Sequence, residues 1–427
     1  MRKDSMKTNT KLIDAYLEEF ECQKGSQNFL NAITNYYILK GSQTNLFKCF
    51  LPQAWRLSSV TGVQGFIHPE GVYDDPKGGA LREEMYKRLR YHFQFQNQKI
   101  LFPIGDRVKY SLNIFAASRH VSFIHLANLF HPKTIDACFE NDGNGEVGGI
   151  KTEDNQWNLA GHRQRLINVK EQMLSLFAKL YDDPGTPSLQ ARLPVLHSQQ
   201  LQSVLNKFAS TPKRLVDLNL AYFTTVMWDE TNSVKKDGTI RRDTCFPEYI
   251  SDLVMSGPHF NVGTPLYKTP RRICTEKAHY DCLDLTNLPD NYLPRTNYCP
   301  DLSKSEYISR IPTVPWGEKK SVTNFYRIVT RKMLSQAGAR TLISSIIPPG
   351  SAHIHGCISH AFSNLSYLVN IASLFSSIPF DFFVKTTGRS NFMESTAEQL
   401  PFLANDLRRA VRILSLNCLT THYAELW

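Results

Sequence analysis

The sequence lacks the short motifs of the common catalytic and metal sites. None of its nine cysteines belongs to a C-x-x-C pair or to a close cluster with histidine, which argues against a zinc site and a disulfide framework. His353, His355 and His360 have no carboxylate at ligand spacing, so we interpret them as ordinary polar residues. A P-loop, a G-x-S-x-G elbow and a P-D-(D/E)-x-K-like nuclease signature are also missing. The motifs alone predict no catalytic constellation and no metal.

Long apolar runs are missing as well. The first thirty residues mix Lys, Glu and Asp, so no signal peptide is predicted. The most apolar window, residues 367–384, contains Asn370 and Asp381, which argues against a bilayer-spanning helix. We therefore expect a soluble cytoplasmic protein without a membrane partner, in which the cysteines are reduced.

The composition is that of a globular protein with a basic excess. Its 427 residues are 42% hydrophobic, which leaves room for two or three domains. The formal net charge is +10, and residues 205–340 carry +6 of it. This excess favours a polyanionic partner, because phosphate contacts dominate non-specific nucleic-acid affinity. Many basic proteins bind no nucleic acid, so the charge leaves both alternatives open.

The first 115 residues alternate between helical and extended patterns. Helices are expected at 43–57 and 78–90, and strands at 62–69, 91–96 and 110–115. An open, mostly parallel sheet would accommodate this order, since helices between strands cover its faces. Three strands are too few for such a sheet, which therefore looks like one half of a larger α/β fold.

The pattern changes after residue 118 and again after residue 256. The middle of the chain reads as a largely helical connector, with helices expected at 163–180 and 194–208. The part that follows is rich in proline, which is typical of loops that present side chains. We predict three domains, at 1–118, 119–256 and 257–427.

The last predicted domain mixes strands and helices. Strands are expected at 342–347 and 380–384, and helices at 363–376 and 403–423. The fold class is therefore predicted as α/β, with half a sheet first, then a helical connector and then a mixed α+β region.

Two glycine-containing motifs are interpreted as structural. Gly143, Gly145 and Gly148 satisfy G-x-G-x-x-G, but no apolar strand precedes them and no helix follows, so we expect a flexible loop. The segment Ile347–Gly350 contains two adjacent prolines, as the catalytic loop of adenine methyltransferases does. It lacks the polar first residue and the aromatic last residue that this loop needs, so we interpret it as a turn that ends a strand.

Cations interleaved with aromatic residues make residues 257–300 the best candidate for a binding surface. This pattern suits phosphate contact combined with base contact, although a solvated basic loop explains it too. The cations are Lys268, Arg271, Arg272 and Lys277, interleaved with Phe260, Tyr267 and Tyr280, and the loop that follows adds Arg295 and Asn297.

A second polar stretch, KTTGRSNF, contains Lys385, Arg389 and Asn391. Arginine and asparagine have the hydrogen-bonding groups that recognise guanine and adenine edges. A glycine-containing turn would explain the same residues. We include all three residues among the candidate DNA contacts.

The order of these segments resembles the large adenine-specific N6 DNA methyltransferases of fused restriction-modification (type IIG-like) and phage-defence systems. The stretches QTNLFKCFLPQAWRLSS, GVQGFIHPEGVYDD and GGALREEMYKRLR look like the part of the catalytic domain that follows the N-P-P-aromatic loop. The stretches GPHFNVGTPLYKTPR, LPDNYLPRTNY, RTLISSIIPPG and QLPFL look like the target-recognition region.

This resemblance implies a component of an S-adenosylmethionine-dependent enzyme that acts on double-stranded DNA. Pro69, Glu70 and Gly71 would end the fifth strand of its sheet, beside the active site. The family's cofactor-binding and catalytic motifs would lie before Met1, so we expect a partner polypeptide to carry them and no cofactor to bind this chain alone. A stand-alone DNA-binding module and an inactive gene remnant remain as alternatives.

Overall fold

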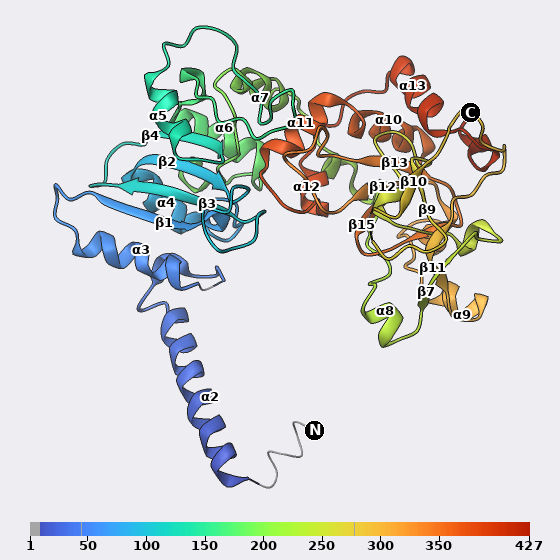
Figure 1. Cartoon of the computed structure of the whole chain (residues 1–427), viewed down its shortest axis with the longest axis horizontal. Coiled ribbons are helices and arrows are strands. Elements are labelled where there is room, and N and C mark those ends of the chain that lie inside the picture. The colour runs from blue at the N-terminus through green and yellow to red at the C-terminus, as the bar shows by residue number, and fades with distance from the viewer. Residues whose placement is uncertain (1–8, 44, 277) are drawn as a thin grey trace. The chain divides into compact units, whose positions relative to one another are not determined.

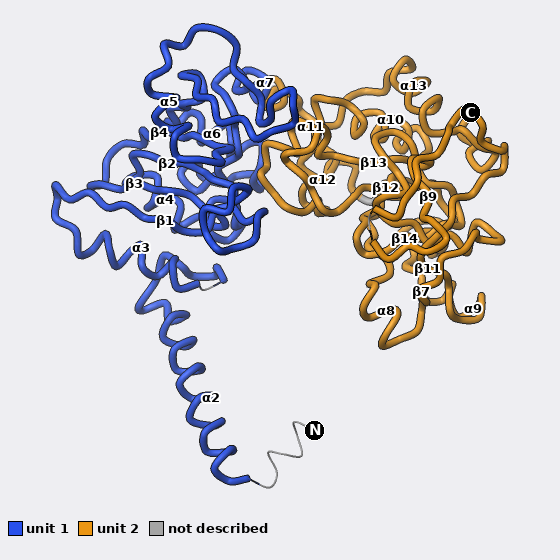
Figure 2. The backbone as a smooth tube through the Cα atoms, viewed as in Figure 1, with its two compact units in different colours: residues 1–206 blue, residues 207–427 orange. Residues whose placement is uncertain are grey.

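A computed structural model describes residues 9–43, 45–276 and 278–427. The chain divides into two compact units, which we call unit 1 (residues 1–206) and unit 2 (residues 207–427; Figure 2). This division has one boundary, after residue 206, and the domain boundaries that we expected at 118 and 256 stay predictions. The fold is mixed, with helices and several separate sheets (Figure 1).

Unit 1 is built on a five-stranded sheet in the order β1-β3-β2-β4-β5. Its strands are β1 (Gln64–Pro69), β2 (Leu89–Gln96), β3 (Lys109–Phe115), β4 (Ser122–Leu129) and β5 (Ile167–Lys170). β3 is antiparallel to both of its neighbours, so β1 and β2 run in the same direction. Of the four strand pairings, only that of β2 with β4 is parallel. The expectation of a mostly parallel sheet is therefore wrong.

The three strands predicted in the first 115 residues are present, but β4 and β5 were missed. Both fall in the stretch that we expected to be largely helical. β4 contains His125 and Asn128, and these polar residues interrupt the apolar run by which a buried strand is recognised. The helix expected at 163–180 begins at Glu171, because the residues before it form a 3-10 turn and then β5.

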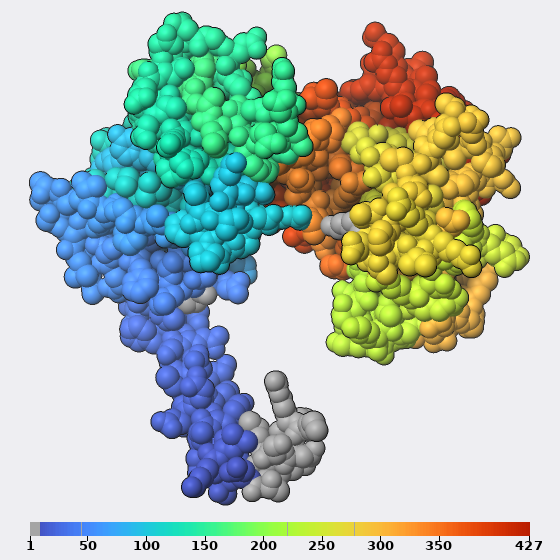
Figure 3. All heavy atoms as spheres, viewed as in Figure 1, coloured from blue at the N-terminus to red at the C-terminus, as the bar shows by residue number. Residues whose placement is uncertain are grey.

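Helices pack on the sheet of unit 1. The helices of this unit are α2 (Thr10–Asn31), α3 (Leu46–Leu57), α4 (Gly79–Arg88), α5 (Lys133–Glu140), α6 (Glu171–Tyr181) and most of α7 (Leu201–Ala209). One sheet face is apolar, and there Phe93, Leu126 and Leu129 form a core cluster with Cys138 of α5. α2 has no buried residue and extends away from the rest of unit 1 (Figure 3).

The centre of unit 2 is a four-stranded antiparallel sheet in the order β13-β12-β15-β6. Its strands are β6 (Tyr222–Thr225), β12 (Arg327–Arg331), β13 (Ser344–Ile347) and β15 (Cys357–Phe362). Three two-stranded pairs accompany it: β7 (Ile240–Cys245) with β11 (Thr296–Pro300), β8 (Val254–Met255) with β14 (Ala352–His353), and β9 (Lys268–Pro270) with β10 (Tyr280–Cys282).

The prolines after β13 end the strand, as the sequence predicts. β13 stops at Ile347, and Gly350 adopts a φ of 92° in the turn that follows. The Gly350 amide donates a hydrogen bond of 2.7 Å to the carbonyl of Thr323. A residue with a side chain would be strained at this φ, which accounts for the glycine.

In unit 2 the strand expected at 380–384 is wrong, and the helix expected at 403–423 is shorter than predicted, because it covers residues 407–417. These helices are α8 (Asn232–Lys235), α9 (Lys304–Ser309), α10 (Leu365–Phe375), α11 (Ile378–Thr386), α12 (Glu394–Glu398) and α13 (Leu407–Asn417). Residues 380–384 are helical, because Ser377 caps the Phe380 amide and Pro379 occupies the first turn.

In the described part of the chain no single helix is long and apolar enough to cross a bilayer. The two helices α10 and α11 reach that length together, but they are bent by 70° relative to each other.

Candidate functional site

Four of the candidate DNA contacts, Lys268, Arg271, Arg272 and Arg295, lie around strand β9 in unit 2. Lys268 is the first residue of β9, and Arg271 and Arg272 directly follow the strand. Arg295 comes from a distant loop, and its backbone amide donates a hydrogen bond of 3.0 Å to the Thr269 hydroxyl. The chain thus brings these four cations to one region, while Lys277 lies outside the described residues.

Two of these cations stack on aromatic rings. The Arg295 guanidinium lies 4.4 Å from the centre of the Phe246 ring, and the Lys268 ammonium lies 5.1 Å from that of Tyr267. Phe246 is 55% exposed, so this pair forms part of the surface. Phe246 was missed by the sequence reasoning, because neither strand β7 before it nor its exposure was predicted. A partly exposed arginine over an aromatic ring can contact phosphate or a base.

Arg271 and Arg272 are both exposed. The Arg271 Nε donates to Asp281 Oδ1 at 2.9 Å, and both side chains are more than half exposed. An exposed ion pair of this kind contributes little to stability, so exchanging Asp281 for another anion is not costly. Both arginines are therefore accessible to an anionic ligand.

Asn297 is not accessible, contrary to its predicted role. Its side chain is 7% exposed and hydrogen-bonded at both ends. The amide nitrogen donates to the Tyr280 hydroxyl at 2.7 Å, and the amide oxygen accepts from the Thr244 hydroxyl at 3.0 Å. In this arrangement Asn297 holds β11 to neighbouring segments and has no free edge for a base.

Lys385, Arg389 and Asn391 form a second group at the end of α11. The Lys385 ammonium donates to the Gly338 carbonyl at 3.1 Å, and burial lowers its pKa. Arg389 donates to the Thr396 hydroxyl at 2.7 Å. Asn391 is exposed and bridges to Met333 through the backbone. Lys385 and Arg389 thus stabilise this turn, and Asn391 is the most accessible of the three.

In unit 1, Pro69 is the last residue of β1, Glu70 and Gly71 follow it, and a buried hydrogen-bond chain fixes the position of Pro69. The Tyr73 hydroxyl donates to Asn113 Oδ1 at 2.6 Å, and Asn113 Nδ2 lies 3.0 Å from His68 Nε2. His68 Nδ1 lies 2.9 Å from the Pro69 carbonyl oxygen. Every contact is satisfied if the His68 proton is on Nδ1. The end of β1 is therefore held rigidly, while Pro69 and Gly71 remain exposed.

Glu70 lies beside a pair of buried histidines that the sequence did not reveal. Its Oε1 is 3.1 Å from His92 Nε2, and His92 Nδ1 is 2.7 Å from His125 Nδ1. Burial lowers the pKa of His125 well below its usual range, so His125 is neutral. We assign its proton to Nδ1, which donates to His92. His125 Nε2 is then buried and has no hydrogen-bond partner among the described residues.

Charged groups also gather near Glu70. Burial lowers the pKa of Lys109 to about 8, while Glu70 and Asp74 act in the opposite direction. Burial raises the pKa of the Asp74 carboxyl. The histidines and Lys109 come from β2, β4 and β3, so tertiary structure alone brings them together. The arrangement can hold or exchange protons beside the end of β1.

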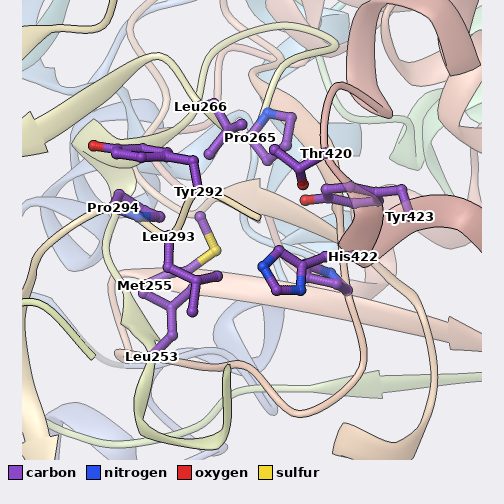
Figure 4. A pocket seen from close by; sticks show the side chains of 11 residues that line it. Leu253, Met255, Pro265, Leu266, Tyr292, Leu293, Pro294, Thr420, His422 and Tyr423 are labelled. Carbon is purple, nitrogen blue, oxygen red and sulfur yellow. The ribbon is translucent and has the colours of Figure 1, made fainter. Parts of the chain in front are cut away.

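Two features that could be taken for a cofactor site are a glycine-rich segment in unit 1 and a small cavity in unit 2. Gly143, Gly145 and Gly148 lie in an irregular segment after α5 and not between a strand and a helix, so they do not form a phosphate-binding turn. A cavity in unit 2, lined by Met255, Leu293 and Tyr423 among others, has about 10 Å³ of space (Figure 4). This is room for about one water molecule and not for a nucleobase.

Comparison with known proteins gives weak structural matches only. No protein-family model matches the chain, and a search of curated proteins finds no match. Among solved structures, the chain is similar to the type IIG restriction endonuclease BpuSI, with 12% sequence identity and a TM-score of 0.28. It is also similar to the type IIL restriction-modification enzyme MmeI in complex with DNA, with 9% identity and a TM-score of 0.38.

The two matches cover 90% and 91% of this chain, but 46% and 45% of those proteins. The chain thus spans just under half the length of each. One neighbour is described as a restriction endonuclease and the other as a restriction-modification enzyme. At these TM-scores the likeness supports no conclusion about the activity of this chain.

Proposed function

We propose that this chain is a component of a site-specific adenine-N6 DNA methyltransferase of a restriction-modification or phage-defence system. In this proposal unit 2 contributes contacts to double-stranded DNA. The observation that carries it is the group of cations around β9: Arg271 and Arg272 are exposed, and partly exposed Arg295 stacks on exposed Phe246. Cations beside aromatic rings provide phosphate contact and base stacking in one surface.

The methyltransferase part of the proposal rests on the segment resemblance and on the sheet of unit 1. β3 runs in reverse between β1 and β2, which share one direction. This is the order expected of a methyltransferase sheet in which one reversed strand lies between the last two parallel strands. β4 and β5 extend the sheet beyond that pattern.

One edge of the unit 1 sheet supports the need for a partner polypeptide. β1 is at the end of the strand order and pairs with β3 alone among the described strands. Exposed apolar side chains accompany this edge, namely Phe50, Leu57, Val63 and Ile67. An open strand edge with an apolar surround favours association with another chain. We propose that the partner carries the S-adenosylmethionine site and the catalytic N-P-P-aromatic loop.

The proposal predicts a separation between binding and catalysis. The purified chain should bind duplex DNA but should neither bind S-adenosylmethionine nor methylate DNA. Calorimetry with S-adenosylmethionine and transfer of a labelled methyl group to DNA would measure this directly. Methyl transfer by the lone chain would overturn our placement of the catalytic site.

A non-enzymatic DNA-binding module is the second candidate, because the same surface around β9 supports it. The two candidate functions predict different products of a neighbouring reading frame, and different methyltransferase activity when that product is co-expressed with this chain. A neighbouring product with an N-P-P-aromatic loop that gains methyltransferase activity when co-purified with this chain supports the enzyme component. Unchanged activity of that product, with duplex binding by this chain intact, supports the module.

A further inference from the structure

Two cysteines that are 54 positions apart in the sequence meet in unit 2. The Cys245 sulfur lies 3.0 Å from the Cys299 sulfur, and both are free thiols. Cys245 is the last residue of β7, and Cys299 lies in β11, its only partner strand among the described residues. Sequence spacing had given no sign of this pair, because it is created by strand pairing.

The surroundings make the two thiols unequal. Cys299 is 6% exposed, whereas Cys245 is partly exposed. Burial, together with the neighbouring Cys245 thiol, raises the pKa of Cys299 to about 12. Reagents in solution therefore reach Cys245 first, and Cys299 is placed to react in a second step.

Asp243 lies beside the pair, so a metal site has to be weighed. The three ligand atoms of Asp243, Cys245 and Cys299 lie within 4.8 Å of one another. Two thiolates on a tetrahedral zinc ion would be about 3.8 Å apart, given a zinc–sulfur bond of about 2.3 Å. The sulfurs are closer than this, and Arg241 Nη2 lies 3.5 Å from Asp243 Oδ2, where it opposes a cation. These observations favour a dithiol over a metal centre.

We propose that Cys245 and Cys299 form a redox-responsive dithiol that closes to a disulfide on reaction with a low-molecular-weight disulfide. The Cys245 thiolate attacks one sulfur of that molecule, forms a mixed disulfide and releases one small thiol. The Cys299 thiol then loses its proton and attacks the Cys245 sulfur, which releases the second small thiol. The two protein thiols are oxidised, and one small disulfide is reduced to two thiols.

The disulfide would join the two ends of a long segment. Residues 246–298 lie between the two cysteines and include β8, β9 and β10. A β-bulge between Thr296 and Tyr298 interrupts the β7–β11 ladder just before Cys299, so the backbone pairing there is incomplete. Closing this segment covalently restricts the unfolded chain and stabilises the pair of strands. The inference does not depend on DNA binding.

Thiol mapping of the full-length chain tests this proposal. The protein is equilibrated in glutathione buffers of decreasing reducing power, free thiols are alkylated, and peptides are identified by mass spectrometry. We expect a Cys245–Cys299 linked peptide that forms before the buffers are fully oxidising and disappears when reductant is restored. The linked form should also unfold at a higher urea concentration than the reduced form.

Variants separate this outcome from the alternatives. Cys245→Ser should leave Cys299 reduced, and Asp243→Asn and Cys282→Ser should both retain the link. Capping of Cys245 by glutathione without any link to Cys299 would overturn the proposal. So would one equivalent of zinc that stays bound to the wild-type chain during dialysis and is lost in Asp243→Asn.

Discussion

Asn297 shows at the scale of single residues how sequence and structure can differ. Its residue type and its place among basic loops favoured a base contact, yet its amide is buried and occupied at both ends by Tyr280 and Thr244. Whether a polar side chain faces solvent depends on neighbours that are distant in sequence. Lys268, Arg271 and Arg272 were easier to place, because long charged side chains are seldom fully buried.

Replacing Asn297 should therefore affect stability. Asn297→Ala removes the hydrogen-bond partners of Tyr280 and Thr244, which should lower the free energy of unfolding by about 1–3 kcal/mol. The exposed Asn391→Ala is the control, with an expected change within about 0.5 kcal/mol. Urea denaturation measures both. Unchanged stability of Asn297→Ala together with weaker DNA binding would contradict the structural role.

Buried histidines should make the protein sensitive to acid. Burial lowers the pKa of His360 to about 4, whereas an unfolded histidine has a pKa of about 6.5. Between these values the unfolded chain binds the additional proton, so stability is complete above about pH 6.5 and falls as the pH drops toward 4.

His360→Gln tests this dependence. The variant should lose less stability between pH 7 and pH 5 than the wild-type chain does, as measured by urea unfolding at each pH. His120→Gln, at an exposed position, is the matched control for the loss of a histidine as such. An identical pH dependence in His360→Gln and the wild-type chain would show that folding does not change the pKa of His360, which would contradict its lowered pKa.

At the scale of elements, strands and helices with strong local patterns were predictable and their partners were not. α3, α4, β1, β2 and β3 follow apolar periodicity, and the structure contains all five. Residues 380–384, FDFFV, have the composition of a strand, but the Ser377 cap and Pro379 begin a helix there. The direction of β3 and the addition of β4 depend on hydrogen bonds between segments that local patterns do not encode.

The same limit applies to the candidate site. Lys268, Arg271 and Arg272 lie close together in the sequence, so their spacing revealed them. The stacking of Arg295 on Phe246 joins residues nearly fifty positions apart, and the pair of His92 and His125 joins two different strands. Charge and residue type predicted a basic surface, whereas the contacts between its residues could be found only from the three-dimensional structure.

The open face beside β1 predicts self-association when the partner is absent. Phe50 and Leu57 of α3 are 57% and 80% exposed, and burying one large apolar side chain is worth about 1.5–3 kcal/mol. Phe50→Glu with Leu57→Glu should shift the purified chain toward monomer in sedimentation velocity. Leu407→Glu with Val411→Glu, on exposed positions of α13, should not. A wild-type chain that is already monomeric would contradict this role of the face.

At the scale of the whole molecule, the account divides two tasks between two units. Unit 1 holds a sheet with a rigid turn after β1, and we propose that it needs a partner to complete a methyltransferase site. Unit 2 presents cations from separate loops around β9. We expect the proposed DNA binding to depend on salt, because each phosphate that is neutralised releases counterions.

The most direct test of the central claim, that unit 2 contacts the DNA backbone, is the salt dependence of duplex binding. Arg271→Ala with Arg272→Ala should weaken binding and reduce the slope of log affinity against log salt by about 0.9 for each phosphate that is no longer neutralised. Lys319→Ala with Lys320→Ala removes two other exposed cations from unit 2 and should leave the slope unchanged. The same slope in the arginine variant as in the wild-type chain, or no duplex binding by the wild-type chain, would contradict the account.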